Sequence, residues 1–182
     1  NSDELKQTVA GTLDVRAEKG VMKKFPVLSK IFSILNVAQL AKLQLPDMAR
    51  DGMLYKKITF HASLKEGVFS SKDFFIDSDA IQISAIGGVD FLKKKLDYIA
   101  GVHPLQTLDV IAAKIPIAGW VITNEQGKLI TAYFKIYGTW DNPKVTTITA
   151  KSIGGGTLDR FQRIFQLPEK LITGKGNIIM GR

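Results

Sequence analysis

Side chains suited to acid–base or metal chemistry are scarce in this chain of 182 residues, which has two histidines and no cysteine. The lack of cysteine excludes disulfides, thiolate catalysis and Cys-based zinc sites. His61 alternates with apolar neighbours and is expected on the polar face of a strand, while His103 precedes Pro104 at the expected end of another strand. No pair of carboxylates is spaced against either histidine, so we expect neither an acid–base pair nor a metal site.

Motifs for nucleophilic catalysis and phosphate binding are also missing. The G-x-S-x-G nucleophile elbow does not occur, and Gly174-Lys175 does not complete a P-loop, because Glu169 stands where the first glycine is needed. Gly154-Gly155-Gly156 precedes an expected helix and is interpreted as a flexible joint rather than an anion site. Four aspartates near expected turns lack the spacing of a calcium loop: Asp73, Asp77, Asp79 and Asp90. We therefore predict a protein that is not an enzyme and has no cofactor and no bound metal.

The chain is basic, with a formal net charge of +8 and a pI of about 9.6. Such a balance fits a nucleic-acid partner, an anionic membrane surface or simple solubility. A nucleic-acid surface would interleave aromatic and basic residues on one sheet face, and Tyr133 and Tyr137 around Lys135 give only a faint version of that pattern. We expect no nucleic-acid partner.

No stretch of the sequence approaches the about 18 consecutive apolar residues of a membrane-spanning helix. The chain begins at Asn1 without an initiator methionine or a signal peptide. We expect a piece of a longer protein, with any membrane anchor or targeting segment outside it.

The most regular pattern runs from Met53 to Pro104 and reads as consecutive strands with short turns. Within Lys57 to Lys65, apolar and polar residues alternate with a period of two, which is typical of a strand with one buried and one solvated face. Glu66-Gly67 and the lysine run after Phe91 indicate turns, and Gly87-Gly88 predicts a break or bulge. Consecutive strands with tight links predict an antiparallel meander with one apolar face.

The rest of the chain supplies further strands and amphipathic helices. Strands are predicted at Val9–Ala17, Leu129–Gly138 and Val145–Thr149. Helices are predicted at Val27–Leu43, at Gln106–Lys114 and from a cap at Thr157 to a point before Pro168. The predicted fold class is α+β: a curved antiparallel β-meander forming a groove or half-barrel, with amphipathic helices at its ends or on one face. We expect residues 1–152 to form this β-groove domain and residues 153–182 to form a C-terminal helix and tail, packed on it or extending from it.

Three segments together resemble one family. They are Gly11 to Asn36, Asp51 to Gly87, and the motif Tyr137-Gly138-Thr139-Trp140-Asp141-Asn142-Pro143-Lys144-Val145. Their order and spacing are similar to the C-terminal region of AsmA-like proteins, the class that contains YhdP. The resemblance covers roughly Gly11 to Val145, and the tail after Ser152 departs from it.

The resemblance implies an envelope protein of a Gram-negative bacterium. Members are typically anchored in the inner membrane and project a β-rich groove through the periplasm, where they are implicated in moving phospholipids toward the outer membrane and in its integrity. It therefore implies phospholipid acyl chains as partners, a membrane tether outside this chain, and possible contacts with adjoining domains of the same parent chain. It carries over no catalytic residue.

The apolar face of the predicted sheet is the candidate site. A lipid chain could bind there by burial alone, because each methylene removed from water contributes about 0.8 kcal/mol. The alternative, a closed hydrophobic core in an envelope protein-interaction or assembly domain without lipid, gives the same alternation and remains open. The candidate lipid-binding residues are Ile58, Phe60, Leu64, Ile81, Ile83, Ile130, Phe134 and Ile136.

Overall fold

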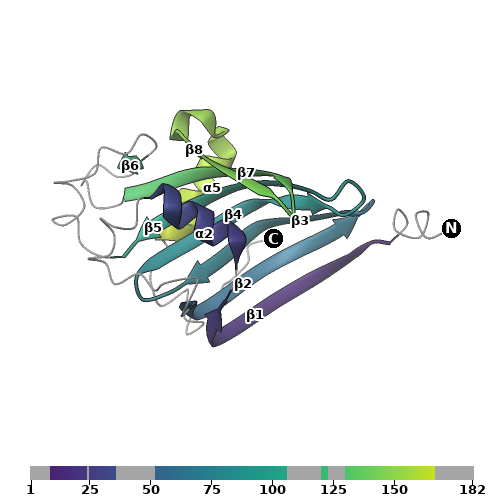
Figure 1. Ribbon diagram of the computed structural model, residues 1–182, viewed down its shortest axis with the longest axis horizontal. Coiled ribbons are helices and arrows are strands. Elements are labelled where there is room, and N and C mark those ends of the chain that lie inside the picture. Colours follow the sequence, from purple (N-terminus) through teal and green to yellow (C-terminus); the bar gives the residue numbers. More distant parts are fainter. Residues whose placement is uncertain (1–8, 24, 36–51, 106–119, 123–129, 167–182) are drawn as a thin grey trace, which may run out of the picture.

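A computed structural model describes residues 9–23, 25–35, 52–105, 120–122 and 130–166 of the chain. Within these residues the strands form one eight-stranded antiparallel sheet in the order β1-β2-β3-β4-β5-β7-β6, with β8 paired to β7 beside β6 (Figure 1). The strands are β1 Gly11–Met22, β2 Met53–Lys65, β3 Val68–Asp77, β4 Ile81–Asp90, β5 Lys95–Pro104, β6 Trp120–Ile122, β7 Ile130–Thr139 and β8 Pro143–Ile148.

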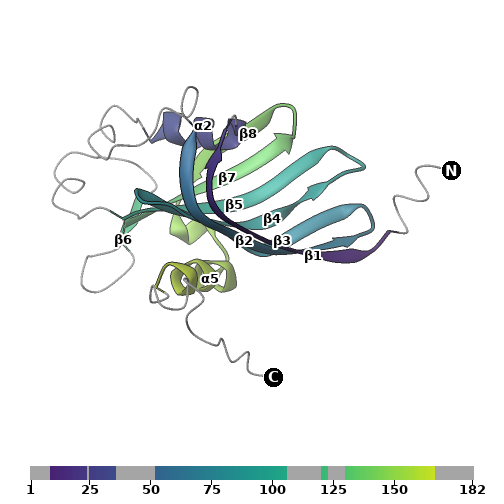
Figure 2. The same ribbon diagram turned by 90° about the horizontal axis from the view of Figure 1, so that it is seen from below.

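The predicted curved meander is confirmed. Strands β2 to β5 pair in chain order, and Figure 2 shows that the sheet curls so that β1 and β2 bend around one of its faces. β1 does not pair with β6 or β8 among the described residues, so the sheet stays open rather than closing into a barrel.

Two details of the strand prediction are wrong. β1 continues past Ala17, where it was expected to end, and reaches Met22 although Lys19 takes a left-handed φ of 54° inside the strand. β4 also continues through Gly87-Gly88, where a break or bulge was expected. These glycines let neighbouring strands approach closely, since a Cβ on Gly87 would lie 2.1 Å from the Asp97 carbonyl oxygen. The register shift lies opposite Gly87, in β3 between Ser71 and Phe74.

In the described part of the chain, two α-helices cover opposite faces of the sheet (Figure 2). Helix α2, Pro26–Ile34, lies on the inside of the curve, and we call the face it covers the inner face. Helix α5, Gly155–Gln166, follows the short 3-10 helix η2, Ala150–Ser152, and lies on the outer face. Residues 36–43 and 106–114 of the predicted helices fall outside the described residues.

The prediction of a joint at residues 154–156 with a cap at Thr157 is wrong. Helix α5 already begins at Gly155, and the Gly154 carbonyl oxygen accepts hydrogen bonds from the Thr157 and Leu158 amides at 2.9 and 3.1 Å. Glycine is tolerated before a helix, so the glycines start the helix instead of separating it from the sheet.

Each covered face has its own hydrophobic core. The inner core joins α2 to the sheet, and its buried members are Leu28, Ile31, Phe32, Leu35, Met53, Ile76, Ile81, Ile83, Ala85, Ala100, Val102, Ala132, Phe134 and Ile136. The outer core joins α5 to the sheet through Phe75, Tyr133, Ile153, Phe161 and Phe165. Because successive strand residues point to opposite faces, Tyr133 and Phe134 belong to different cores.

Candidate functional site

The inner face contains an apolar cavity of about 320 Å³ beside the N-terminal half of α2. The helix lines it with Pro26, Val27, Leu28 and Ile31, and Phe25 precedes the helix. The sheet and its turns supply Phe74, Ile76, Ile83, Ala85, Val89, Leu96, Tyr98, Ala100, Ile136, Trp140 and Pro143. The small side chains of Ala85 and Ala100 leave space under the start of the helix that no larger residue fills.

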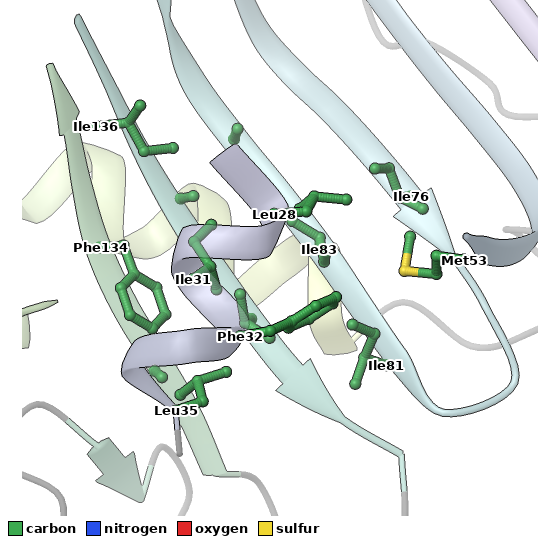
Figure 3. Packing of buried hydrophobic residues seen from close by; sticks show 14 residues of the cluster. Leu28, Ile31, Phe32, Leu35, Met53, Ile76, Ile81, Ile83, Phe134 and Ile136 are labelled. Carbon is green, nitrogen blue, oxygen red and sulfur yellow. The ribbon is translucent and has the colours of Figure 1, made fainter. Parts of the chain in front are cut away.

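Helix α2 is held over the sheet by its apolar side chains and by a side-chain hydrogen bond. Pro26 occupies the first turn, where a missing N–H costs nothing. Figure 3 shows Leu28, Ile31 and Phe32 directed at the strands. The Lys30 ammonium group donates a 2.5 Å hydrogen bond to the Pro143 carbonyl oxygen, which ties the helix to the start of β8.

The predicted lipid-binding residues fall into different environments. Ile83 and Ile136 line the cavity. Ile81 and Phe134 are buried in the inner core beneath α2, away from the cavity lining (Figure 3). Ile58 is half-buried against the inner core. The remaining three are Phe60 and Leu64, which are half-buried in β2, and Ile130, which begins β7 but whose side chain lies outside the described part of the chain.

A row of aromatic rings extends the cavity lining across the uncovered part of the inner face. Phe60 contacts Phe74 and Phe69, with ring centroids 5.5 and 6.4 Å apart. Phe69 contacts Phe91 edge to face at 6.4 Å, and Phe91 contacts Trp140 at 5.7 Å. Because Phe74 and Trp140 line the cavity, the row leads from β2 across the hairpin ends and back to the cavity.

Sequence reasoning missed several residues of this site. Val89 and Leu96 lie within the predicted meander but were not assigned to the candidate site, and Trp140 was named only in the motif that resembles the family. The alternation of Leu96 with Tyr98 and Ala100 was a usable signal. The position of Trp140 over the cavity depends on the hairpin between β7 and β8, and no local pattern carries that information.

The described lining of the cavity is almost entirely apolar. None of its described lining residues is charged, and the Tyr98 hydroxyl has its pKa raised above the ordinary range by burial, so it stays protonated. The described residues contain no cluster of three or more His, Cys, Asp or Glu side chains suited to a metal ion. What such a cavity can do is remove hydrocarbon from water.

The outer face holds a charged cluster that the sequence analysis did not anticipate. The two ring nitrogens of His61 contact two carboxylates, with Nε2 2.9 Å from Asp14 Oδ1 and Nδ1 2.5 Å from Asp73 Oδ2. The expectation that no carboxylate pair faces His61 is therefore wrong, because cross-strand pairing brings β1 and β3 to either side of β2. The hydrogen bond and charge of Asp73 raise the pKa of His61 above its ordinary value, with a smaller contribution from Asp14. Both contacts are exposed to solvent, so this cluster links three strands rather than forming a buried site.

Comparison with known families decides which protein class this sheet belongs to. The family model described as "YhdP protein" matches residues 5–145, well over half of the chain. The chain belongs to the YhdP protein family. The resemblance seen in the sequence is thus confirmed, and the family is a non-enzymatic family of the Gram-negative cell envelope. No curated protein and no solved structure matches the chain.

The YhdP family match covers some elements of the fold and not others. It includes α2, the described strands through the first residues of β8, and every residue of the cavity lining. It stops at residue 145, before η2 and α5, so the helix that covers the outer face lies beyond it. In the described part of the chain, no helix has both the length and the apolar character needed to cross a membrane.

Proposed function

We propose that this chain is a lipid-binding module of an envelope protein, and that the inner-face cavity holds part of a phospholipid acyl chain. The observation that supports this most directly is the cavity itself, which is uncharged along its described lining and opens beside a row of aromatic rings. Its volume of about 320 Å³ lies at the lower end of the roughly 300–1,000 Å³ typical of ligand sites. Such a space suits a segment of one hydrocarbon chain better than a whole diacyl lipid.

Binding would rest on burial rather than on polar recognition. Each methylene group that enters the cavity contributes about 0.8 kcal/mol, so a few carbons already give measurable affinity. A site of this kind binds the hydrocarbon of an acyl chain and leaves the lipid headgroup outside. That property suits a protein that passes phospholipids along an apolar surface toward the outer membrane.

The wider setting belongs to the same proposal. Membership of the YhdP family supports a role in phospholipid movement and outer-membrane integrity. We place the chain in the periplasm, tethered to the inner membrane through a segment outside these residues, with adjoining domains of the parent chain as further partners.

One observation favours the alternative of an assembly domain with a closed core. Leu28, Ile31 and Phe134 are almost completely buried, so the part of the inner face beneath α2 is already packed. If the cavity also stays empty in solution, the inner face serves stability, and the module acts through protein contacts.

The experiment that separates the two is native mass spectrometry of the purified chain combined with lipid extraction. We expect phospholipid or fatty acid at a defined ratio, and displacement of a fluorescent fatty acid by unlabelled lipid. Ala85→Leu should fill the cavity and reduce this binding severalfold. Ile86→Phe is a matched control, because Ile86 is the next residue of β4 and packs in the outer core.

The outcomes are distinct. Bound lipid that Ala85→Leu displaces and Ile86→Phe retains supports the proposal. A folded chain that is free of lipid and does not bind the fluorescent fatty acid contradicts it and favours the assembly domain.

A further inference from the structure

The ends of three hairpins lie at the end of the sheet away from β6, and their residues together make up one side of the molecule's surface (Figure 1). We call this surface the tip rim and define it as residues 65–68, 90–95 and 139–144. The Phe91 amide donates a 2.9 Å hydrogen bond to the Gly67 carbonyl oxygen, and the Trp140 amide donates a 3.2 Å bond to that of Lys94. Leu92 lies over Gly67, where an added Cβ would be only 2.8 Å from Leu92 Cγ. The three hairpins are therefore held in fixed positions relative to one another.

The tip rim exposes large apolar side chains although the sheet behind it has two buried cores. The exposed fractions are 39% for Val68, 45% for Phe91, 38% for Leu92 and 38% for Trp140. A single exposed apolar residue needs no explanation, but a group of them on adjoining hairpins indicates an interaction surface. Tryptophan is typical of the boundary between water and a lipid bilayer, and phenylalanine and leucine are typical of the apolar face that interfacial helices bury there.

Charge on the tip rim complements an anionic surface. It carries five basic residues, Lys65, Lys93, Lys94, Lys95 and Lys144, against three acidic residues, Glu66, Asp90 and Asp141. Lys93 pairs with Asp90 at 3.1 Å and Lys65 with Glu66 at 3.6 Å. Within the described residues, no acidic side chain forms an ion pair with Lys94 or Lys95, and both are exposed.

We propose that the tip rim docks on a phospholipid bilayer that contains anionic lipids. In this arrangement Phe91, Leu92 and Trp140 enter the headgroup region, while the lysines meet lipid phosphates. Trp140 also lines the cavity and contacts Phe91, so the docked rim places the cavity beside the bilayer surface. The rim shares Trp140 and Pro143 with the cavity lining, but its other residues lie outside that lining. Docking of the rim does not require the cavity to hold a lipid chain.

Vesicle binding tests the docking directly. The purified 182-residue chain is sedimented with vesicles of phosphatidylcholine alone and with vesicles that also contain phosphatidylglycerol. The chain has two tryptophans, so Trp120→Phe leaves Trp140 as the reporter. We expect cosedimentation mainly with the anionic vesicles, a blue shift of Trp140 emission, and quenching of that emission by lipids brominated near the headgroup end of the acyl chain.

Paired variants assign the contact to the rim. Lys94→Gln with Lys95→Gln should weaken binding to anionic vesicles roughly thirtyfold, since each lysine near such a surface contributes about 1 kcal/mol. The control is Lys19→Gln with Lys151→Gln, which removes two exposed lysines outside the rim, one of them with a left-handed φ like that of Lys94. Leu92→Ser should reduce insertion, whereas Leu54→Ser, at a residue 65% exposed near the other end of β2, should not.

Three results would overturn the proposal. One is the absence of binding to either vesicle, which would point to a protein partner for the rim. The second is sedimentation without any change or quenching of Trp140 emission. The third is equal weakening by the rim and control variants. Ala85→Leu separates this proposal from the cavity function, because it should reduce binding of the lipid chain severalfold and leave vesicle docking intact.

Discussion

Within the described residues, each face of the sheet is covered by one helix, and the inner face keeps an apolar cavity beside its helix. On the outer face, Phe161 and Phe165 of α5 stack with ring centroids 6.4 Å apart, and Phe161 also packs on Tyr133 at 5.5 Å. Gly101 allows this approach, since a Cβ there would lie 3.0 Å from Phe165. On the inner face, the start of α2 lies over Ala85 and Ala100 and leaves about 320 Å³ unfilled.

Whether a cavity forms depends on how side-chain sizes match across a helix–sheet contact. Both faces arise from the same alternation of strand residues. The outer face sets large rings of the helix against glycine in the sheet, which gives close packing. The inner face sets the aliphatic side chains of the first turn of α2 against alanine, and the helix is not close enough to fill the gap.

The largest expected effect is a loss of stability, and it tests whether the packing on both faces stabilises the fold. Phe134 and Phe161 are each 0% exposed, on the inner and outer face respectively. Replacing either by alanine should lower the free energy of unfolding by about 3–5 kcal/mol, because a buried ring is lost and a cavity remains. Denaturant unfolding followed by circular dichroism measures this. A loss below about 1 kcal/mol for Phe161→Ala would mean that α5 does not pack on the sheet in solution.

Adjacent residues of β5 sharpen the contrast between the faces. Gly101→Ala should cost about 1–3 kcal/mol, because its new methyl group meets Phe161 and Phe165. Ala100→Val adds two carbons on the other face and should change stability by less than about 1 kcal/mol, since they enter the cavity. Thermal unfolding of both variants under identical conditions gives the comparison. Equal destabilisation would indicate that the cavity collapses in solution.

A smaller effect concerns the attachment of α2. Lys30→Met removes the hydrogen bond to the Pro143 carbonyl oxygen and should lower the free energy of unfolding by about 0.5–1.5 kcal/mol. Hydrogen exchange of the amides of α2 should rise in this variant, while exchange in α5 stays unchanged. Similar exchange increases in both helices would show that the faces are coupled and not independent.

The smallest effect is the pH dependence of the His61 cluster. Because Asp73 raises the pKa of His61 in the folded state, protonated His61 stabilises the fold fully below the unfolded pKa of about 6.5. This contribution is lost as the pH rises through the higher folded pKa. NMR titration of the His61 ring should give a pKa above its ordinary value, and Asp73→Asn should lower it. An unchanged pKa in Asp73→Asn would mean that the two side chains do not interact in solution.

The sequence predicted the sheet well because alternation is local information. The meander and the strand at β7 both depended on residues close together in the chain. What could not be predicted depended on contacts between distant segments. Ile81 and Ile83 occupy equivalent positions in the alternation of β4. The place where α2 packs on the sheet decides that Ile83 lines the cavity and Ile81 does not. Likewise Asp14 and Asp73 meet His61 only through strand pairing.

The register shift in β3 has a consequence for how this strand can vary in length. Phe69 and Phe74 both contact Phe60 on the inner face, although an odd spacing of five would place them on opposite faces of a regular strand. β3 has one extra residue between Ser71 and Phe74, and this residue brings Phe69 and Phe74 to the same face. Deleting one residue there would restore the regular two-residue alternation. Phe69 would then turn to the outer face and the aromatic row would be broken, although the composition would hardly change. Insertions and deletions should therefore be tolerated in this segment only in pairs.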